Sequence, residues 1–198
     1  GEVLGIAGVA GNGQDELLLA LSGEIKSEEG MVKATGVGVG RLGPNDRRRI
    51  GFVAAPEDRL GHAAAPDMSL VENAFLTGAI RKGLTNRGFI DWAATRDFAE
   101  RVIKAYDVRT PGSHVAARAL SGGNMQKLIL GRALLHPDTT PTHTVTPKLI
   151  VAHQPTWGLD IGAVAYVQEQ LIAARDAGAA VLLISDDLDE VLTLGDQV

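Results

Sequence analysis

Short apolar runs alternate along the chain with longer amphipathic stretches. The apolar runs predict buried strands over residues 3–7, 50–55, 148–152 and 179–185. The longer stretches predict helices over residues 13–23, 91–108, 120–135 and 164–178. In residues 91–108, the apolar side chains of Ala99, Val102, Ile103 and Tyr106 are spaced as one helix face. Strands that alternate with helices in this way predict an α/β fold, with a parallel sheet and crossover helices.

A glycine-rich stretch, GVAGNGQDEL at residues 8–17, joins the first predicted strand to the first predicted helix. Gly8 and Gly13 have the spacing of a phosphate-binding loop, G-x-x-x-x-G-K-[ST]. Such a loop binds phosphate through backbone N–H groups, a lysine and a hydroxyl that holds Mg²⁺. Here the lysine position holds Gln14 and the hydroxyl position holds Asp15. Taken alone, the stretch is equally consistent with a strand-to-helix turn that binds nothing.

A second motif, LSGGNMQK, comes directly before the helix predicted at residues 120–135. It resembles the signature sequence of ABC ATPases, L-S-G-G-Q, with Asn124 in the glutamine position. Ser121 is expected to cap the helix, and the two glycines let a phosphate approach the first backbone N–H groups. The alternative is an ordinary serine-capped helix. The signature residues are Leu120, Ser121, Gly122, Gly123 and Asn124.

Three further stretches follow the family order and extend the resemblance over nearly the whole chain. Residues 149–160 resemble a Walker B strand and D-loop, residues 181–191 a switch strand, and residues 52–59 a Q-loop. The chain thus resembles the nucleotide-binding domain of ABC transporters. More narrowly, it resembles the second ATP-binding half of sugar- and nucleoside-importer ATPases, which carry two such halves in one chain.

The resemblance implies a RecA-like P-loop core with a parallel sheet and an inserted helical subdomain. The core is predicted over residues 1–57 and 128–198, and the helical subdomain over residues 58–127, ending in the signature. The candidate nucleotide-binding residues are Gly8, Gly11, Asn12, Gly13, Gln14, Asp15 and Glu57, and the D-loop residues are Gly158, Leu159 and Asp160.

The charged groups that family members use on their own nucleotide are replaced here. His153 stands in the Walker B position, Gln154 in that of the catalytic glutamate, Asp186 in that of the switch histidine, and Glu57 in that of the Q-loop glutamine. No catalytic residue is intact, because the Gln154 amide is no base. Loss of one charge-assisted hydrogen bond of about 1.5–3 kcal/mol costs about 10- to 100-fold in affinity. This half is therefore expected to bind ATP weakly at its own loop and to hydrolyse it poorly or not at all.

The signature and the D-loop are retained, and in the family they act across a dimer. The resemblance implies that this half closes over ATP and Mg²⁺ held by a second ABC half, the preceding domain of the same chain. It also implies transmembrane permease subunits as partners, and a peripheral location on the cytoplasmic face of a bacterial membrane. Two other functions stay open: a working ABC ATPase that tolerates Gln14 and Gln154, and a non-transport ABC-type scaffold.

Asp15 and His153 replace two groups that lie around Mg²⁺ in the family. An ion pair between them would occupy the position of the metal and join the loop to the sheet. The alternative is an uncharged histidine at the edge of the core. No metal is therefore expected at this site.

Composition restricts the possible functions further. The chain has 198 residues, of which 45% are hydrophobic and 22% charged, as in ordinary globular proteins. The net charge of −5 argues against a nucleic-acid partner. The absence of cysteine excludes disulfides and thiolate chemistry. The chain begins without Met and stops within a pattern, which suggests a piece of a longer protein. The basic run at residues 46–50 is interpreted as a solvated turn, and the Thr- and Pro-rich residues 136–147 as a surface insertion.

Overall fold

The computed structural model describes the chain except for residues 35, 82 and 136–146, so the predicted surface insertion lies almost entirely outside the described residues. The chain divides into two compact units. The first contains Gly1–Pro56, Pro147–Pro155 and Leu171–Val198, and the second contains Glu57–Thr146 and Thr156–Gln170. The predicted subdomain boundaries at residues 58 and 127 stay a prediction.

The first unit is built on a parallel sheet in the order β1-β8-β7-β4. Its strands are β1 (Glu2–Ala7), β4 (Phe52–Ala55), β7 (Leu149–His153) and β8 (Ala180–Ser185). These are the four apolar runs, so the predicted α/β class with a parallel sheet is confirmed. The first unit also holds a short antiparallel pair, β2 (Lys33–Ala34) and β3 (Val37–Gly38), which the apolar pattern does not predict.

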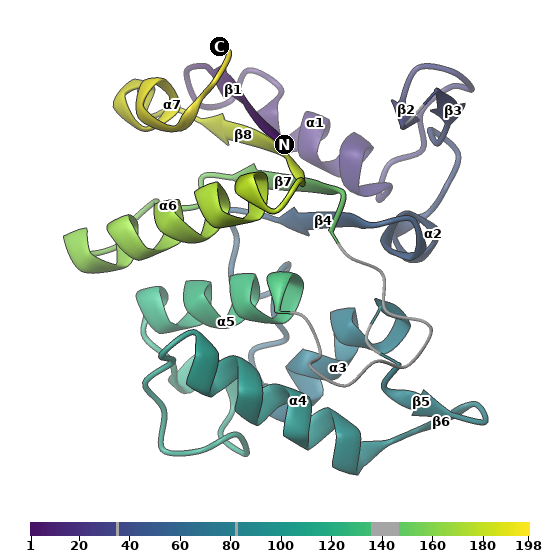
Figure 1. Cartoon of the computed structure of the whole chain (residues 1–198), viewed down its shortest axis with the longest axis vertical. Coiled ribbons are helices and arrows are strands. Elements are labelled where there is room, and N and C mark those ends of the chain that lie inside the picture. The colour runs from purple at the N-terminus through teal and green to yellow at the C-terminus, as the bar shows by residue number, and fades with distance from the viewer. Residues whose placement is uncertain (35, 82, 136–146) are drawn as a thin grey trace. The chain divides into compact units, whose positions relative to one another are not determined.

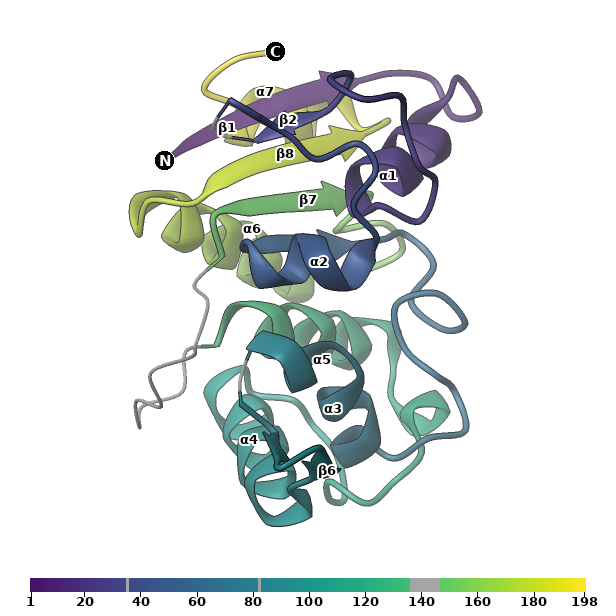
Figure 2. The same cartoon turned by 90° about the vertical axis from the view of Figure 1, so that its right-hand side faces the viewer.

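Helices of the first unit cover the two faces of this sheet. Helices α1 (Gln14–Ser22) and α2 (Pro44–Arg49) lie on one face, and α7 (Leu188–Leu194) lies on the other (Figures 1 and 2). Leu18 of α1 packs against Val151 of β7 and Ile184 of β8 in the core. Helix α1 ends at Gly23, whose backbone is left-handed, as the glycine at this position predicts.

Arg47, in the basic run of α2, is one of the largest fully buried side chains of the described residues. Its guanidinium donates hydrogen bonds to backbone carbonyls of residues 20, 21, 39, 40 and 42. Burial lowers the pKa of Arg47. The prediction of a solvated turn is therefore wrong at this residue, although the neighbouring Arg49 is exposed and pairs with Asp46.

The second unit is mainly helical. It contains α3 (Leu70–Arg81), a hairpin of β5 (Thr85–Asn86) and β6 (Phe89–Ile90), α4 (Trp92–Ala105), a 3₁₀ turn (Ala117–Ala119), α5 (Gly122–Leu134) and the beginning of α6 (Ile161–Asp176). The predicted face of α4 is confirmed, since Ala99 and Val102 are fully buried and Tyr106 nearly so. Asp91 caps α4 by accepting a hydrogen bond from the Ala94 N–H at 2.9 Å.

Candidate nucleotide loop and signature sites

The carboxyl ends of the parallel strands bring several candidate residues of the first unit to one edge of the sheet. The glycine loop follows β1, His153 and Gln154 lie at the end of β7, and Asp186 follows β8. Ligands of open α/β sheets bind at this edge. Glu57 follows β4 by two residues and belongs to the second unit.

The glycine loop keeps the backbone conformation of a phosphate cradle. Gly11 and Gly13 have positive φ angles of 83° and 98°, and Gly13 directly precedes α1. Residues with a side chain rarely adopt such angles. The need for glycine at these two positions therefore follows from the strand-to-helix turn itself, whether or not a ligand binds.

The Gln14 side chain folds back onto this loop. Its Oε1 atom accepts a hydrogen bond from the Asn12 N–H at 2.8 Å, and its Nε2 atom donates to the Val9 carbonyl at 2.8 Å. A Cβ atom at Gly8 would lie only 2.9 Å from that Nε2, so Gly8 makes room for the amide. The side chain in the lysine position thus binds the loop's own backbone, and the Asn12 N–H already has its acceptor.

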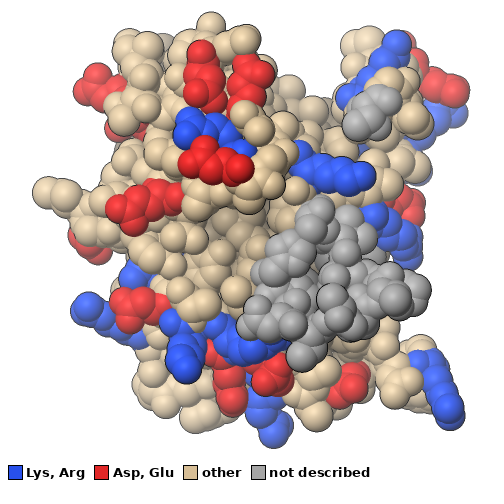
Figure 3. Space-filling view, viewed as in Figure 1, with Lys and Arg blue, Asp and Glu red and all other residues tan. Residues whose placement is uncertain are grey.

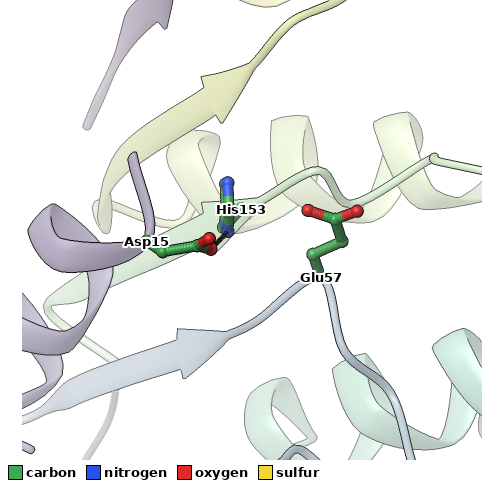
Figure 4. Close-up of side chains that lie close together, drawn as sticks. All are labelled: Asp15, Glu57 and His153. Carbon is green, nitrogen blue, oxygen red and sulfur yellow. Dashed lines mark ion pairs between the residues drawn. The ribbon is translucent and has the colours of Figure 1, made fainter. Parts of the chain in front are cut away.

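The Asp15 and His153 side chains lie side by side (Figure 4). The distance from His153 Nδ1 to Asp15 Oδ1 is 3.5 Å, within ion-pair range. His153 is buried and its Nδ1 makes no hydrogen bond, whereas the Asp15 side chain is 77% exposed. An imidazole nitrogen is a poor ligand for Mg²⁺, which prefers oxygen atoms. These residues therefore do not fit the Mg²⁺ that the family holds here.

Gln154 is bound inward, to the segment that follows β8. It adopts a positive φ of 48°, and its N–H donates to the Ile184 carbonyl at 2.8 Å. Its Oε1 lies 3.3 Å from the Ser185 hydroxyl and accepts a hydrogen bond from the Asp186 N–H at 3.4 Å. The Gln154 amide, which the resemblance places in the position of the catalytic glutamate, thus uses its oxygen on its own fold.

Two residues of this network were missed by the sequence analysis. The Ser185 hydroxyl donates to Glu190 Oε2 at 2.8 Å, and both side chains are buried. The acidic run at residues 186–190 has the composition of a solvated helix start, but Glu190 within it is buried. The sequence signal for Ser185 is its position at the end of a buried strand. Its partner Glu190 can be recognised only in the folded chain.

In the second unit, Ser121 stands at the N-cap of α5 without capping it. Its side chain makes no hydrogen bond to the backbone of that helix, so the expected serine cap is wrong. Instead, Ser121 Oγ accepts a hydrogen bond from Asn124 Nδ2 at 2.9 Å. Asn124 Oδ1 in turn accepts from the Arg109 N–H at 2.7 Å.

The D-loop lies against the beginning of α5. Asp160 Oδ1 accepts from the Ala163 N–H at 3.0 Å and so caps α6. A Cβ atom at Gly123 would lie 3.2 Å from the Ala163 side chain, and one at Gly122 would lie 3.9 Å from Leu159. Gly123 therefore allows close packing of these two helix starts within the second unit, whereas a side-chain carbon at Gly122 would make only an ordinary contact.

Arg59, which the sequence analysis did not single out, holds this arrangement together. Its guanidinium donates to the Trp157 carbonyl of the D-loop and to Gln126 Oε1 of α5, the latter at 3.1 Å. Burial lowers the pKa of Arg59, and the carboxylate of Glu57 acts in the opposite direction. Arg59 is the last residue of the stretch at residues 52–59 that resembles a Q-loop, but the sequence of this stretch does not indicate which residues Arg59 binds.

The parallel sheet, with a glycine loop between β1 and α1, is that of a P-loop nucleotide-binding fold. The solved ATP-binding cassette MJ0796, a dimer bound to ADP and Pi, matches with a TM-score of 0.74 at 22% identity, over 96% of this chain and 77% of that one. A nucleotide-free cassette from an ABC transporter matches with a TM-score of 0.69 at 24% identity, over 98% of this chain and 74% of that one. These likenesses establish the fold.

The family follows from the sequence comparisons. The family model for ABC transporters matches residues 1–139, and the chain belongs to this family. Over its whole length it is 40% identical to the guanosine import ATP-binding protein NupO of Bacillus subtilis and 37% identical to the ribose import ATP-binding protein RbsA 1 of Streptomyces avermitilis. It covers 37% and 36% of these proteins, so it spans little more than a third of the relatives' length.

Proposed function

We propose that this chain is an ATP-binding domain of an ABC importer whose own site is degenerate and whose signature completes the ATP site of a second half. One observation carries the proposal: Gln14 fills its own loop, whereas Ser121 is held by Asn124 beside two signature glycines. Gln14 and Gln154, which would serve a nucleotide of this domain, are bound to their own fold. The residues that would serve a partner's nucleotide are retained.

Electrostatics support the first part of the proposal. A carboxylate about 4 Å from a phosphate oxygen adds repulsion of about 4 kcal/mol at an effective dielectric constant near 20. Asp15 is exposed beside the loop, and Asp186 follows the neighbouring strand β8. A site that attracts phosphate in the family would therefore be neutral or negative here.

The relatives support the transport role and the class of solute. Guanosine, ribose and glucose import are named for proteins that match this whole chain at 36–40% identity. We infer a simple sugar or a nucleoside as solute, transmembrane permease subunits as partners, and a peripheral position on the cytoplasmic side of the membrane. In the described part of the chain no helix is long and apolar enough to cross a bilayer. On the face shown in Figure 3, basic and acidic side chains are interspersed rather than gathered into the basic patch typical of nucleic-acid binding.

The experiment that tests this function compares two substitutions in the full-length protein, one in the degenerate site and one in the signature. Gln154→Ala alters only the degenerate site, and we expect steady-state ATP turnover to stay within about threefold of wild type. Substitution of the signature is expected to stop turnover. If this half were a working ATPase, Gln154→Ala would abolish turnover. That result would overturn the proposal. A scaffold would show no response to either change and would not co-purify with a membrane protein.

A gain of nucleotide binding is expected from Gln14→Lys. The substitution removes the acceptor that occupies the Asn12 N–H and adds a positive charge, so ATP affinity at this loop should rise about 10- to 100-fold. Equilibrium binding of a fluorescent ATP analogue measures it. Gln14→Leu is the matched control, because it removes both side-chain hydrogen bonds without adding charge. A wild-type loop that already binds as tightly as the lysine variant would contradict the degenerate site.

A further inference from the structure

We propose that Asn124 is a positioning residue that fixes the direction of the Ser121 hydroxyl proton, so that this hydroxyl donates to the terminal phosphate of a nucleotide held by the partner half. The inference rests on the proposed function. It adds a role for the residue by which this signature departs from the family's glutamine.

The orientation of the Asn124 amide follows from its partners. A backbone N–H can only donate, so the Asn124 atom that lies 2.7 Å from the Arg109 nitrogen must be the carbonyl oxygen. The NH₂ group therefore faces Ser121 Oγ at 2.9 Å. Side-chain amide orientation is fixed by hydrogen bonds of this kind rather than by shape, since oxygen and nitrogen are nearly the same size.

The state of the serine hydroxyl follows in turn. An NH₂ group can only donate, so Ser121 Oγ must accept from it. A hydroxyl has one proton to donate, and this contact leaves that proton unused. Because the Ser121 side chain makes no cap hydrogen bond to α5, the helix backbone does not determine the hydroxyl direction either. Asn124 thus presents Ser121 as a donor, which is the form that an anionic phosphate oxygen requires.

The support for Asn124 is itself held in place. The Arg109 N–H lies just after α4, where the preceding Val108 is buried and its N–H donates to the Ile103 carbonyl at 2.9 Å. One turn further along α5, Lys127 Nζ donates to the Asp107 carbonyl at 3.2 Å and lies 4.7 Å from the centre of the Tyr166 ring. The segment that orients Asn124 is therefore held to α4 through Val108 and to α5 through Asp107, the two residues before Arg109.

The test is a double-mutant cycle on ATP turnover by the full-length protein, with Asn124→Asp and Ser121→Ala. An aspartate keeps the oxygen that accepts from Arg109 and has nearly the same volume, but it offers Ser121 an acceptor instead of a donor. The hydroxyl then turns its proton inward. We expect kcat to fall about tenfold on Asn124→Asp, and about 100-fold on Ser121→Ala, as for loss of one preorganised donor. In the Ser121→Ala background, Asn124→Asp should change kcat less than about twofold, since no hydroxyl remains.

Two controls separate the role of Asn124 from charge and from stability. Asn86→Asp, on the exposed hairpin strand β5, makes the same charge change and should leave kcat unchanged. A new carboxylate in the first turn of α5 favours the helix dipole, so the melting temperature should not fall with Asn124→Asp. If the new carboxylate acted only by repelling ATP, Asn124→Asp would raise KM, and by the same factor with and without the Ser121 hydroxyl.

The outcomes distinguish this inference from the proposed function. If Ser121→Ala leaves turnover unchanged, the cross-dimer function itself is wrong. If Ser121→Ala lowers turnover and Asn124→Asp lowers kcat by the same factor with and without the hydroxyl, the proposed function stands and the positioning role is overturned.

Discussion

The full-length protein carrying Ser121→Arg is expected to lose ATP turnover about 10²- to 10³-fold. The substitution removes a hydroxyl that would donate to the partner's nucleotide, and loss of one preorganised donor typically has an effect of this size on kcat. It also places a long side chain beside Gly122 and Gly123, where the surface must approach a phosphate closely. The hydrolysing site in this interpretation belongs to the other half, so the effect acts across the dimer.

Stability is not expected to explain that loss. Ser121 makes no cap hydrogen bond to α5, so its replacement removes no helix cap. Thr85→Arg, on the exposed strand β5 of the same unit, is the matched control and should retain wild-type turnover. Both variants should melt within a few degrees of wild type. Turnover by Ser121→Arg equal to that of Thr85→Arg would rule out the cross-dimer role of the signature.

The four strands of the parallel sheet and helices α1, α4, α5 and α6 could be predicted because each is determined by a local pattern. Residues 148–152 are mostly apolar because β7 is buried along almost its whole length, as parallel strands covered on both faces are. Gly23 ends α1 since a left-handed residue is needed there. The approach of Asp15 to His153 follows from the resemblance, because the corresponding positions lie close together around Mg²⁺ in the ABC family.

The side-chain partners could not be predicted in this way. The sequence shows that Gln14 stands where a phosphate-binding loop has its lysine. Only the folded loop shows that the Gln14 amide binds the backbone of Asn12 and Val9. Ser121 is expected to cap α5 because serine is a common N-cap residue. Its side chain instead binds Asn124, which is itself held by Arg109, fifteen positions earlier. Side-chain contacts of this kind carry no periodic signal in the sequence.

Arg47→Met is expected to lower the free energy of unfolding of the first unit by about 3 kcal/mol, the cost of leaving several buried carbonyls without a donor. Ala20 and Leu21 belong to the last turn of α1, where carbonyls have no partner within the helix. Arg47 supplies donors to both and places a positive charge at the carboxyl end of that helix, which its dipole favours. Methionine fills most of the volume but donates nothing.

Equilibrium urea unfolding of the chain measures this loss, and Arg49→Met is the matched control. Arg49 is exposed and, within the described part of the chain, pairs with the nearby Asp46, so its replacement should cost less than about 1 kcal/mol. Arg47→Lys should fall between the two, because a lysine keeps the charge but cannot reach carbonyls in several directions at once. Equal stability of Arg47→Met and Arg49→Met would show that the carbonyls of α1 find other donors. Helix α1 begins at Gln14, directly after the glycine loop. The same experiment therefore also tests whether Arg47 stabilises the helix that follows this loop.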